Sequence, residues 1–202
     1  MTNLTIKATN AMTFLPHRTS KYAVFALVFG AVALIPVGAS AAPSGTMGPK
    51  NPPAASVRAA PDAAFRLQGS LVKLATYRDR KRMIWEVATW CGSCKAGLKA
   101  FAHHQALIDK SDMKIIVLRD YKNGGYPGIT IDKFAAKVAP SLLKDPHCVF
   151  GEATKAFGAA YNPRHFVDIY QLVDARNRIV LTSSAPSVTF GKIEHFIASG
   201  AK

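Results

Sequence analysis

Two cysteines three residues apart are the part of this sequence best suited to chemistry. They lie in the segment Trp90-Cys91-Gly92-Ser93-Cys94, where a β-rich run ends and a helical pattern begins. A cysteine at a helix N-terminus meets unpaired backbone N–H groups and the positive end of the helix dipole, which stabilise a thiolate. Cys94 is within reach of Cys91 and faces the apolar side of the helix. The spacing predicts thiol–disulfide exchange, in which Cys91 attacks and Cys94 resolves the mixed disulfide.

Two other uses of such a pair are a permanent disulfide and half of a zinc site. Zinc normally needs four ligands, and the sequence offers only Cys148 and scattered histidines, without a second close pair. We therefore predict no metal site and no cofactor. Cys148 is expected to be a buried or inert thiol, the alternatives being a regulatory thiol, a partner-linking cysteine or a copper ligand beside the pair. Trp90 is expected to form part of the platform beside the reactive sulfur.

The first 41 residues have the pattern of an export signal. Lys7, Arg18 and Lys21 precede a mostly apolar run from 22 to 37, and Ala39-Ser40-Ala41 offers small residues for cleavage. The run is short for a membrane span, which needs about 20 residues. We predict a cleaved signal peptide at 1–41, with an uncleaved membrane anchor as the alternative, and both would export the rest of the chain.

Residues 42–64 contain five prolines, several small residues and no aromatic side chain. Such a segment cannot bury enough apolar surface to offset its ordering entropy, so we predict a disordered linker followed by one domain at 65–202. The whole chain carries a formal charge of +14, but its basic residues are spread along the sequence without a nucleic-acid motif. The charge predicts a solvated surface and no nucleic-acid partner.

Residues 65–202 alternate between β-forming runs and helical apolar patterns. Strands are predicted at 71–77, 82–88, 113–118, 165–173 and 179–182, and helices at 93–110, 130–138, 152–160 and 188–199. The first two strands are expected to pair across a charged turn, and the last two across another. A βαβ unit followed by a hairpin and a closing helix predicts an α/β fold, with a mixed central sheet and helices on both faces.

The cysteine segment and several later ones together resemble a known family. The stretch from Val87 to Lys95 resembles the active-site segment of the thioredoxin superfamily, in particular its exported, tethered TlpA-like branch. Later elements of that branch are matched in order by Lys144-Asp145-Pro146, Ala156-Phe157-Gly158, Leu172-Val173-Asp174 and Arg178-Ile179-Val180. The resemblance covers most of residues 70–200. It implies a thioredoxin-like fold with Cys91 as the attacking and Cys94 as the resolving cysteine.

Two departures from the family lie close to the cysteines. Ser93 stands where the reducing members usually have proline, which leaves the direction of electron flow open. The family's buried acid falls at Trp85, with Glu86 beside it, and strand alternation points these two side chains to opposite faces. Glu86 is kept as a supporting residue that could assist proton transfer, although a solvent-facing side chain is the stronger expectation.

A third departure concerns the family's cis-proline, which lies opposite the cysteine pair and precedes a strand. Pro163 is the only proline nearby, yet it comes about five residues too early. The alternative is Val167-Asp168, with no proline at all. Because a non-proline cis bond costs about 2.5 to 4 kcal/mol, we predict that Pro163 fills this position.

Together these patterns predict a protein thiol–disulfide oxidoreductase that works outside the cytoplasm, in the periplasm or attached to the inner membrane. Its partners would be protein thiols and disulfides, and a membrane or soluble redox protein that resets the cysteine pair. One alternative is a thioredoxin-fold copper carrier using Cys91, Cys94 and Cys148 or a histidine, because soft thiolates select Cu(I). Another is an envelope assembly component whose cysteines are only structural.

Overall fold

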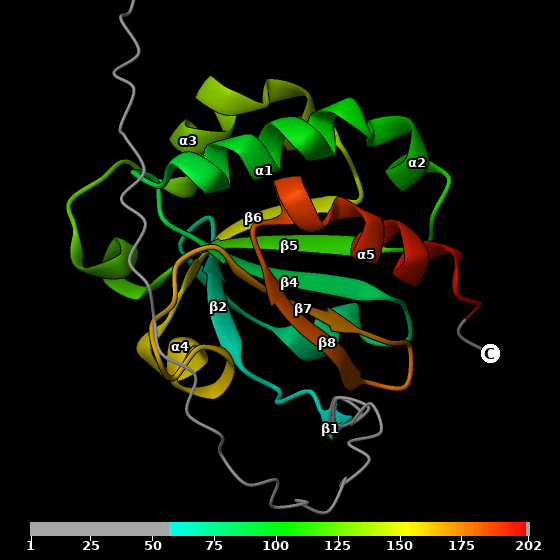
Figure 1. The fold of residues 1–202 in the computed structure, drawn as a ribbon. Helices are drawn as coiled ribbons and strands as arrows, with labels where there is room; N and C mark the ends of the chain where they lie inside the picture. Colours follow the sequence, from blue (N-terminus) through cyan, green and yellow to red (C-terminus); the bar gives the residue numbers. More distant parts are fainter. Residues whose placement is uncertain (1–56, 201–202) are drawn as a thin grey trace, which may run out of the picture. The chain divides into compact units, whose positions relative to one another are not determined.

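A mixed sheet of eight strands runs through the part of the chain that the computed structural model describes, residues 57–200 (Figure 1). The predicted export signal and the first part of the predicted linker, up to residue 56, lie outside the described residues. No helix among residues 57–200 is long and apolar enough to cross a membrane.

The strands follow the order β1-β8-β7-β4-β5-β6-β2-β3 across the sheet. They are β1 (Arg58–Ala59), β2 (Ala64–Leu67), β3 (Ser70–Lys73), β4 (Arg82–Val87), β5 (Lys114–Arg119), β6 (Cys148–Ala153), β7 (Ile169–Val173) and β8 (Arg178–Ser184). The central strands β4, β5 and β6 are parallel, and every other pairing is antiparallel. All six residues of β4 are buried, as expected for a strand covered on both faces.

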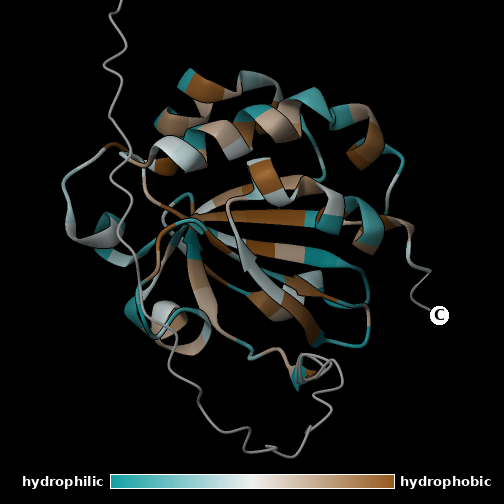
Figure 2. Cartoon of the chain, viewed as in Figure 1, coloured by the Kyte–Doolittle hydropathy of each residue, from teal (hydrophilic) through white to brown (hydrophobic). Residues whose placement is uncertain are grey.

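Helices cover both faces of this sheet (Figures 1 and 2). The helices are α1 (Gly92–His103), α2 (Gln105–Asp109), α3 (Ile131–Val138), α4 (Lys155–Tyr161) and α5 (Pro186–Ala198), with short 3-10 segments η1 (Leu74–Tyr77), η2 (Tyr121–Gly125) and η3 (Pro140–Lys144). Helices α1, α3 and α5 bury their apolar side chains against Met83, Trp85 and Val87 of β4. The other face of β4 packs with α4 and β2, through Ile84, Phe157 and Phe65. The mixed α/β sheet with two covered faces confirms the predicted fold class.

Helix α1 lies very close to the sheet at one position. A Cβ atom added to Gly97 would come within 2.6 Å of Cη2 of Trp85 and within 3.0 Å of Cγ of Pro186. The indole of Trp85 also packs against Phe101, with ring centroids 5.6 Å apart. Because Gly97 has no side chain, the first turns of α1 can rest directly on Trp85, which places the cysteines at the start of the helix over the sheet.

Some predicted elements are confirmed and others are wrong. The helix at 130–138 and the hairpin of β7 and β8 are confirmed. The predicted pairing of the first two strands is wrong, because residues 74–77 form the η1 turn and β3 pairs with β2 instead. The helix predicted at 152–160 begins only after Thr154, whose Oγ1 accepts a hydrogen bond from the Phe157 N–H at 3.1 Å. The residues before it form β6.

The folded unit also begins earlier than residue 65. Strand β1 pairs with β8, and Ala60 is buried. The Tyr161 hydroxyl donates a hydrogen bond of 2.6 Å to the Pro61 carbonyl, and the Ala75 N–H donates one of 2.9 Å to Asp62. The part of the predicted disordered linker after residue 57 is therefore ordered by these long-range contacts, which local composition does not reveal.

Candidate active site

Cys91 is the N-cap residue of α1, immediately after the loop that follows β4. Its backbone is extended, with φ −74° and ψ 124°, and the Cys94 N–H donates a hydrogen bond of 3.2 Å to its sulfur. The Ser93 hydroxyl lies 3.2 Å from the same sulfur. Sγ of Cys91 therefore lies at the N-terminal end of α1, where the first backbone N–H groups of the helix point. This geometry is the one expected of an attacking thiolate.

The two cysteines differ in their surroundings. Cys94 is completely buried, whereas Cys91 keeps 6% of its surface exposed, less than the sequence pattern suggests for an attacking residue. Burial is the main cause that raises the pKa of the Cys94 thiol, and a hydrogen bond with Cys91 adds to it. Cys94 therefore stays protonated until something takes its proton, which suits a resolving residue.

Asp168 is the carboxylate that meets the cysteine pair. A carboxylate oxygen of Asp168 and the sulfurs of Cys91 and Cys94 all lie within 4.8 Å of one another. Asp168 is 3% exposed and precedes β7, with φ of 67° and its N–H donating to the Glu86 carbonyl at 3.1 Å. Burial raises the pKa of the Asp168 carboxyl, and hydrogen bonds from Ser93, Trp85 and Cys94 oppose that rise. A carboxyl group with a raised pKa beside a buried thiol can take up its proton.

Trp85 holds the Asp168 carboxylate in place through a hydrogen bond. The resemblance places the family's buried acid at Trp85, and the structure fills that position with an indole whose Nε1–H donates a hydrogen bond of 2.9 Å to Asp168 Oδ1. A carboxylate therefore reaches the cysteine pair from the segment before β7, and none does so from β4. The sequence indicated Val167-Asp168 only as the alternative cis position, and it did not predict a carboxylate beside the cysteine pair.

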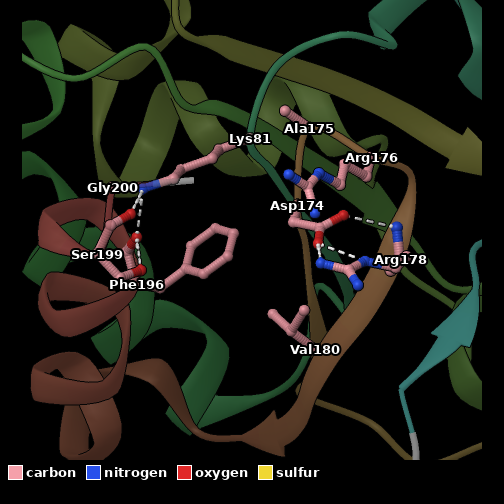
Figure 3. A pocket seen from close by; sticks show the side chains of 9 residues that line it. All are labelled: Lys81, Asp174, Ala175, Arg176, Arg178, Val180, Phe196, Ser199 and Gly200. Atoms are coloured by element: carbon pink, nitrogen blue, oxygen red, sulfur yellow. Dashed lines mark hydrogen bonds and ion pairs between the residues drawn. The ribbon is translucent and has the colours of Figure 1, made fainter. Parts of the chain in front are cut away.

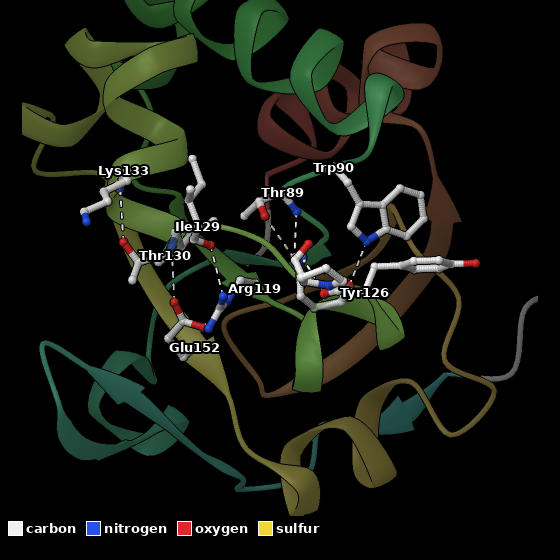
Figure 4. Close-up of polar contacts among 11 residues, drawn as sticks. Thr89, Trp90, Arg119, Tyr126, Ile129, Thr130, Lys133 and Glu152 are labelled. Carbon is white, nitrogen blue, oxygen red and sulfur yellow. Dashed lines mark hydrogen bonds and ion pairs between the residues drawn. The ribbon is translucent and has the colours of Figure 1, made fainter.

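Trp90, directly before Cys91, packs against the glycine-rich loop after β5, which the sequence did not connect with the cysteines (Figure 4). Its indole N–H donates a hydrogen bond of 2.8 Å to the Asn123 carbonyl, and its ring makes an edge contact with Tyr126, at 5.1 Å between centroids. Asn123 Oδ1 accepts the Thr89 N–H at 2.8 Å, and its Nδ2 donates to the Tyr126 carbonyl at 3.0 Å. Asn123 is 3% exposed, so it ties the glycine-rich loop to the segment just before Cys91.

The other end of this loop is fixed to the sheet (Figure 4). Arg119, at the end of β5, pairs with Glu152 of β6 and donates a hydrogen bond of 3.0 Å to the Ile129 carbonyl. Glu152 in turn accepts the Ile131 N–H at 3.1 Å, at the start of α3. The loop is therefore anchored on both sides, and it presents Trp90 and Tyr126, which are 45% and 63% exposed, beside the cysteine motif.

Pro163 is exposed, and Glu86 is buried outside the apolar cluster that contains the two cysteines. The described residues contain no cis peptide bond and Pro163 is exposed, so the prediction that it fills the cis-proline position is wrong. Asp168 lies there instead. The solvent-facing position expected for Glu86 is also wrong, because its side chain is completely buried on the face of the sheet opposite Trp85. The alternation of the two residues between faces is as predicted.

Cys148 does not join the pair. It begins β6, and because β4 and β6 run in the same direction, it lies at the opposite end of the strands from Cys91. Burial is the main cause that raises the pKa of its thiol to about 12. An uncharged, half-buried thiol is a poor nucleophile.

A pocket at the far end of the sheet lies between the start of β4 and the turn from β7 to β8 (Figure 3). Lys81 reaches across it to the end of α5, where its ammonium donates hydrogen bonds to the carbonyls of Phe196 at 2.8 Å and Ile197 at 3.0 Å. On the other side, Asp174 pairs with Arg178 at 2.7 Å. These contacts satisfy the carbonyls at the helix end and stabilise a turn, so the pocket has no part in the cysteine chemistry.

Comparison with known proteins identifies the fold. No protein-family model and no curated protein matches this sequence. A thioredoxin-like protein from Aeropyrum pernix matches with a TM-score of 0.52 and 19% identity, over 68% of this chain and 89% of that one. BsSco, a member of the Sco family of cytochrome c oxidase assembly proteins, matches with a TM-score of 0.51 and 14% identity, over 70% and 94%. A putative protein disulfide isomerase from Bacteroides thetaiotaomicron matches with a TM-score of 0.50 and 18% identity, over 70% and 89%. The chain therefore has a thioredoxin-like fold.

Proposed function

We propose that this chain is a protein thiol–disulfide oxidoreductase that acts outside the cytoplasm through Cys91 and Cys94. The observation that carries the proposal is the pair itself. One sulfur caps a helix and accepts a backbone N–H at 3.2 Å, and the other is fully buried beside a carboxylate. The two sulfurs are thus prepared for different steps of one exchange reaction.

The first step uses the sulfur that α1 stabilises. The Cys91 thiolate attacks one sulfur of a client disulfide, a bond forms between Cys91 and the client, and the second client sulfur leaves as a thiolate. Trp90 and Tyr126 lie beside the motif and offer the client an apolar surface. Buried Cys94 cannot be reached by a client, so the attack is restricted to Cys91.

The second step needs a proton acceptor, and Asp168 supplies it. The Cys94 thiol gives its proton to the Asp168 carboxylate, and the resulting thiolate attacks Cys91 Sγ. The client leaves as a second thiolate, the Cys91–Cys94 disulfide forms, and two electrons have passed to the client. A separate redox partner resets the pair, and the same steps in reverse would oxidise a client.

The redox potential of the pair tests this function. Equilibration in glutathione buffers, followed by alkylation and mass measurement, should show one Cys91–Cys94 disulfide forming in a single two-electron transition. A potential of about −270 mV would assign the protein to reduction, and one of about −120 mV to oxidation. A Cys148→Ser variant is the matched control and should keep the transition. A pair that forms no disulfide in any of these buffers would refute the proposal.

A copper carrier is a second candidate, because the structure brings Cys91, Cys94 and Asp168 within 4.8 Å of one another. The third group is a carboxylate and neither Cys148 nor a histidine, although Cu(I) prefers soft ligands. The geometry thus favours exchange chemistry over Cu(I) transport. Tight stoichiometric Cu(I) binding by the reduced protein that Asp168→Asn weakens would reverse this preference.

Export is supported by the charged start, the apolar run and the small residues at 39–41. Cell fractionation and the mass of the mature protein test it. A product that begins near residue 42 in the periplasm is the expected result, and a membrane-bound full-length product would change the signal peptide to an anchor. A full-length cytosolic protein would contradict export while leaving the exchange chemistry untouched.

A further inference from the structure

A cluster of three metal-ligating side chains lies at the end of the sheet opposite the cysteine pair. Asp109 ends α2, Asp145 follows η3, and His147 directly precedes β6. One carboxylate oxygen of each aspartate and one ring nitrogen of His147 all lie within 4.8 Å of one another. We propose that these three residues bind a divalent transition-metal ion, for which Zn²⁺ is the best match.

Asp145 is the strongest indication of a missing partner. It is 4% exposed, and its Oδ1 accepts the His147 N–H at 2.8 Å. Its Oδ2 is buried and has no hydrogen-bond partner among residues 57–200. A buried carboxylate oxygen without a partner is costly, whereas coordination of a cation would satisfy it.

His147 is oriented in the way that metal-binding histidines commonly are. Its Nδ1 lies 3.1 Å from the Met113 carbonyl oxygen, which can only accept, so Nδ1 carries the proton and donates. This leaves the lone pair on Nε2. Metal-binding histidines typically donate their other ring N–H to a carbonyl or carboxylate, which fixes both the tautomer and the ring direction.

The distances and the ligand types suit zinc. Bonds of about 2.0 to 2.1 Å in a tetrahedral site place ligand atoms roughly 3.3 Å apart, so the cluster needs to close by at most about 1.5 Å. Asp109 is exposed and can supply this movement by side-chain rotation. An imidazole favours zinc and its transition-metal neighbours over Mg²⁺ or Ca²⁺. Three protein ligands leave the fourth position to water.

Two acidic groups and one basic group surround the cluster. Both aspartates raise the pKa of the nearby Cys148 thiol, after burial, and Lys114 lowers it, so all three charged groups act on the same region. The Lys114 ammonium donates to the Pro146 carbonyl, which draws it to the backbone beside the cluster. Two carboxylates and one lysine leave the region negative, as a cation site requires. A bound ion would tie α2 to the loop before β6.

Zinc affinity tests the site directly. The 202-residue chain, in a Cys91→Ser/Cys94→Ser background that removes the two thiols of the pair, is titrated with Zn²⁺ against a chromophoric chelator. One ion should bind per chain. Asp145→Asn and His147→Gln should each lower the affinity more than about 100-fold, beyond the 10- to 100-fold that loss of an outer-shell partner costs.

Two further variants separate binding from folding. Asp109→Asn changes an exposed side chain, so it should weaken zinc binding while leaving the thermal midpoint without zinc unchanged. Asp112→Asn is the matched control, because Asp112 is an exposed acid that belongs to no such cluster among the described residues, and its affinity should stay within about twofold. No zinc binding in the background protein, or equal losses in Asp109→Asn and Asp112→Asn, would overturn the proposal.

Discussion

Glu86 and Asp120 form a buried acidic pair whose ionisation should control stability. Glu86 of β4 is completely buried and Asp120, just after β5, is 2% exposed. The two carboxyl groups face each other, and a protonated Glu86 can donate a hydrogen bond to Asp120, whereas no other residue among those described bonds to their four oxygens. Burial, followed by the charge of Asp120, raises the pKa of Glu86 from its ordinary 4.5 to about 8. The folded protein therefore holds a proton that the unfolded chain releases well below neutral pH.

The size and sign of the effect follow from that difference. Between pH 4.5 and 8 the folded state binds more protons than the unfolded state, so stability is highest at low pH and falls as pH rises. Each pH unit costs at most about 1.4 kcal/mol, and the whole interval at most about 5 kcal/mol. The loss is complete above the folded pKa.

Glu86→Gln tests this pair, because an amide of the same shape never ionises. The variant should be more stable than the wild type at pH 8, by up to about 5 kcal/mol, and nearly equal to it at pH 5. Urea unfolding at pH 5, 6, 7 and 8 gives the comparison. Glu194→Gln, at an exposed glutamate of α5, is the matched control and should follow the wild type. Parallel pH profiles for the wild type and Glu86→Gln would refute the reasoning.

Three other substitutions test the site and its support. Asp168→Asn keeps an acceptor for the Trp85 indole N–H but removes the proton-accepting carboxylate. Release of mixed disulfides in stopped-flow assays should therefore slow by about tenfold or more. An unchanged rate would exclude proton transfer through Asp168. Asn123→Ala leaves the Thr89 N–H and the Tyr126 carbonyl without their partner. It should lower the free energy of unfolding in urea by about 2 to 4 kcal/mol and shift the fluorescence of Trp90. An unaltered spectrum would contradict the anchoring of the loop by Asn123. Gly97→Ala forces a Cβ against the indole and should cost about 1 to 3 kcal/mol, whereas Gly191→Ala, with nothing within 4 Å, should not destabilise.

The elements with strong local signals could be predicted from the sequence. The Cys-x-x-Cys motif between a β-rich run and a helical pattern placed Cys91 correctly at the start of α1. The apolar pattern of α3 and the turn between β7 and β8 are also local, and both are confirmed. These features depend on residues close together in the chain, which periodicity and turn residues report well.

The features that depend on distant residues could not be predicted. Asp168 is 74 residues from Cys94, and it meets the pair only because β7 pairs with β4. Asn123 makes its hydrogen bonds to Thr89 and Tyr126 from a backbone with a positive φ of 56°. It lies in a loop whose sequence has no regular pattern. Strand β6 contains Gly151, because a Cβ atom there would come within 2.7 Å of the Arg66 carbonyl oxygen of the neighbouring strand β2. Glycine is not a strand-forming residue, so the composition of β6 does not predict a strand.

The central claim, that Cys91 attacks and Cys94 resolves, is tested most directly by trapping clients on single-cysteine variants. Each variant is recovered from the host envelope after rapid acid quenching and alkylation, then run on non-reducing gels. Cys94→Ser keeps the attacking thiolate and loses the group that releases the client, so reducible adducts should accumulate on Cys91. Cys91→Ser should give none, because Cys94 is completely buried. Equal adduct patterns for the two variants would contradict the assigned roles.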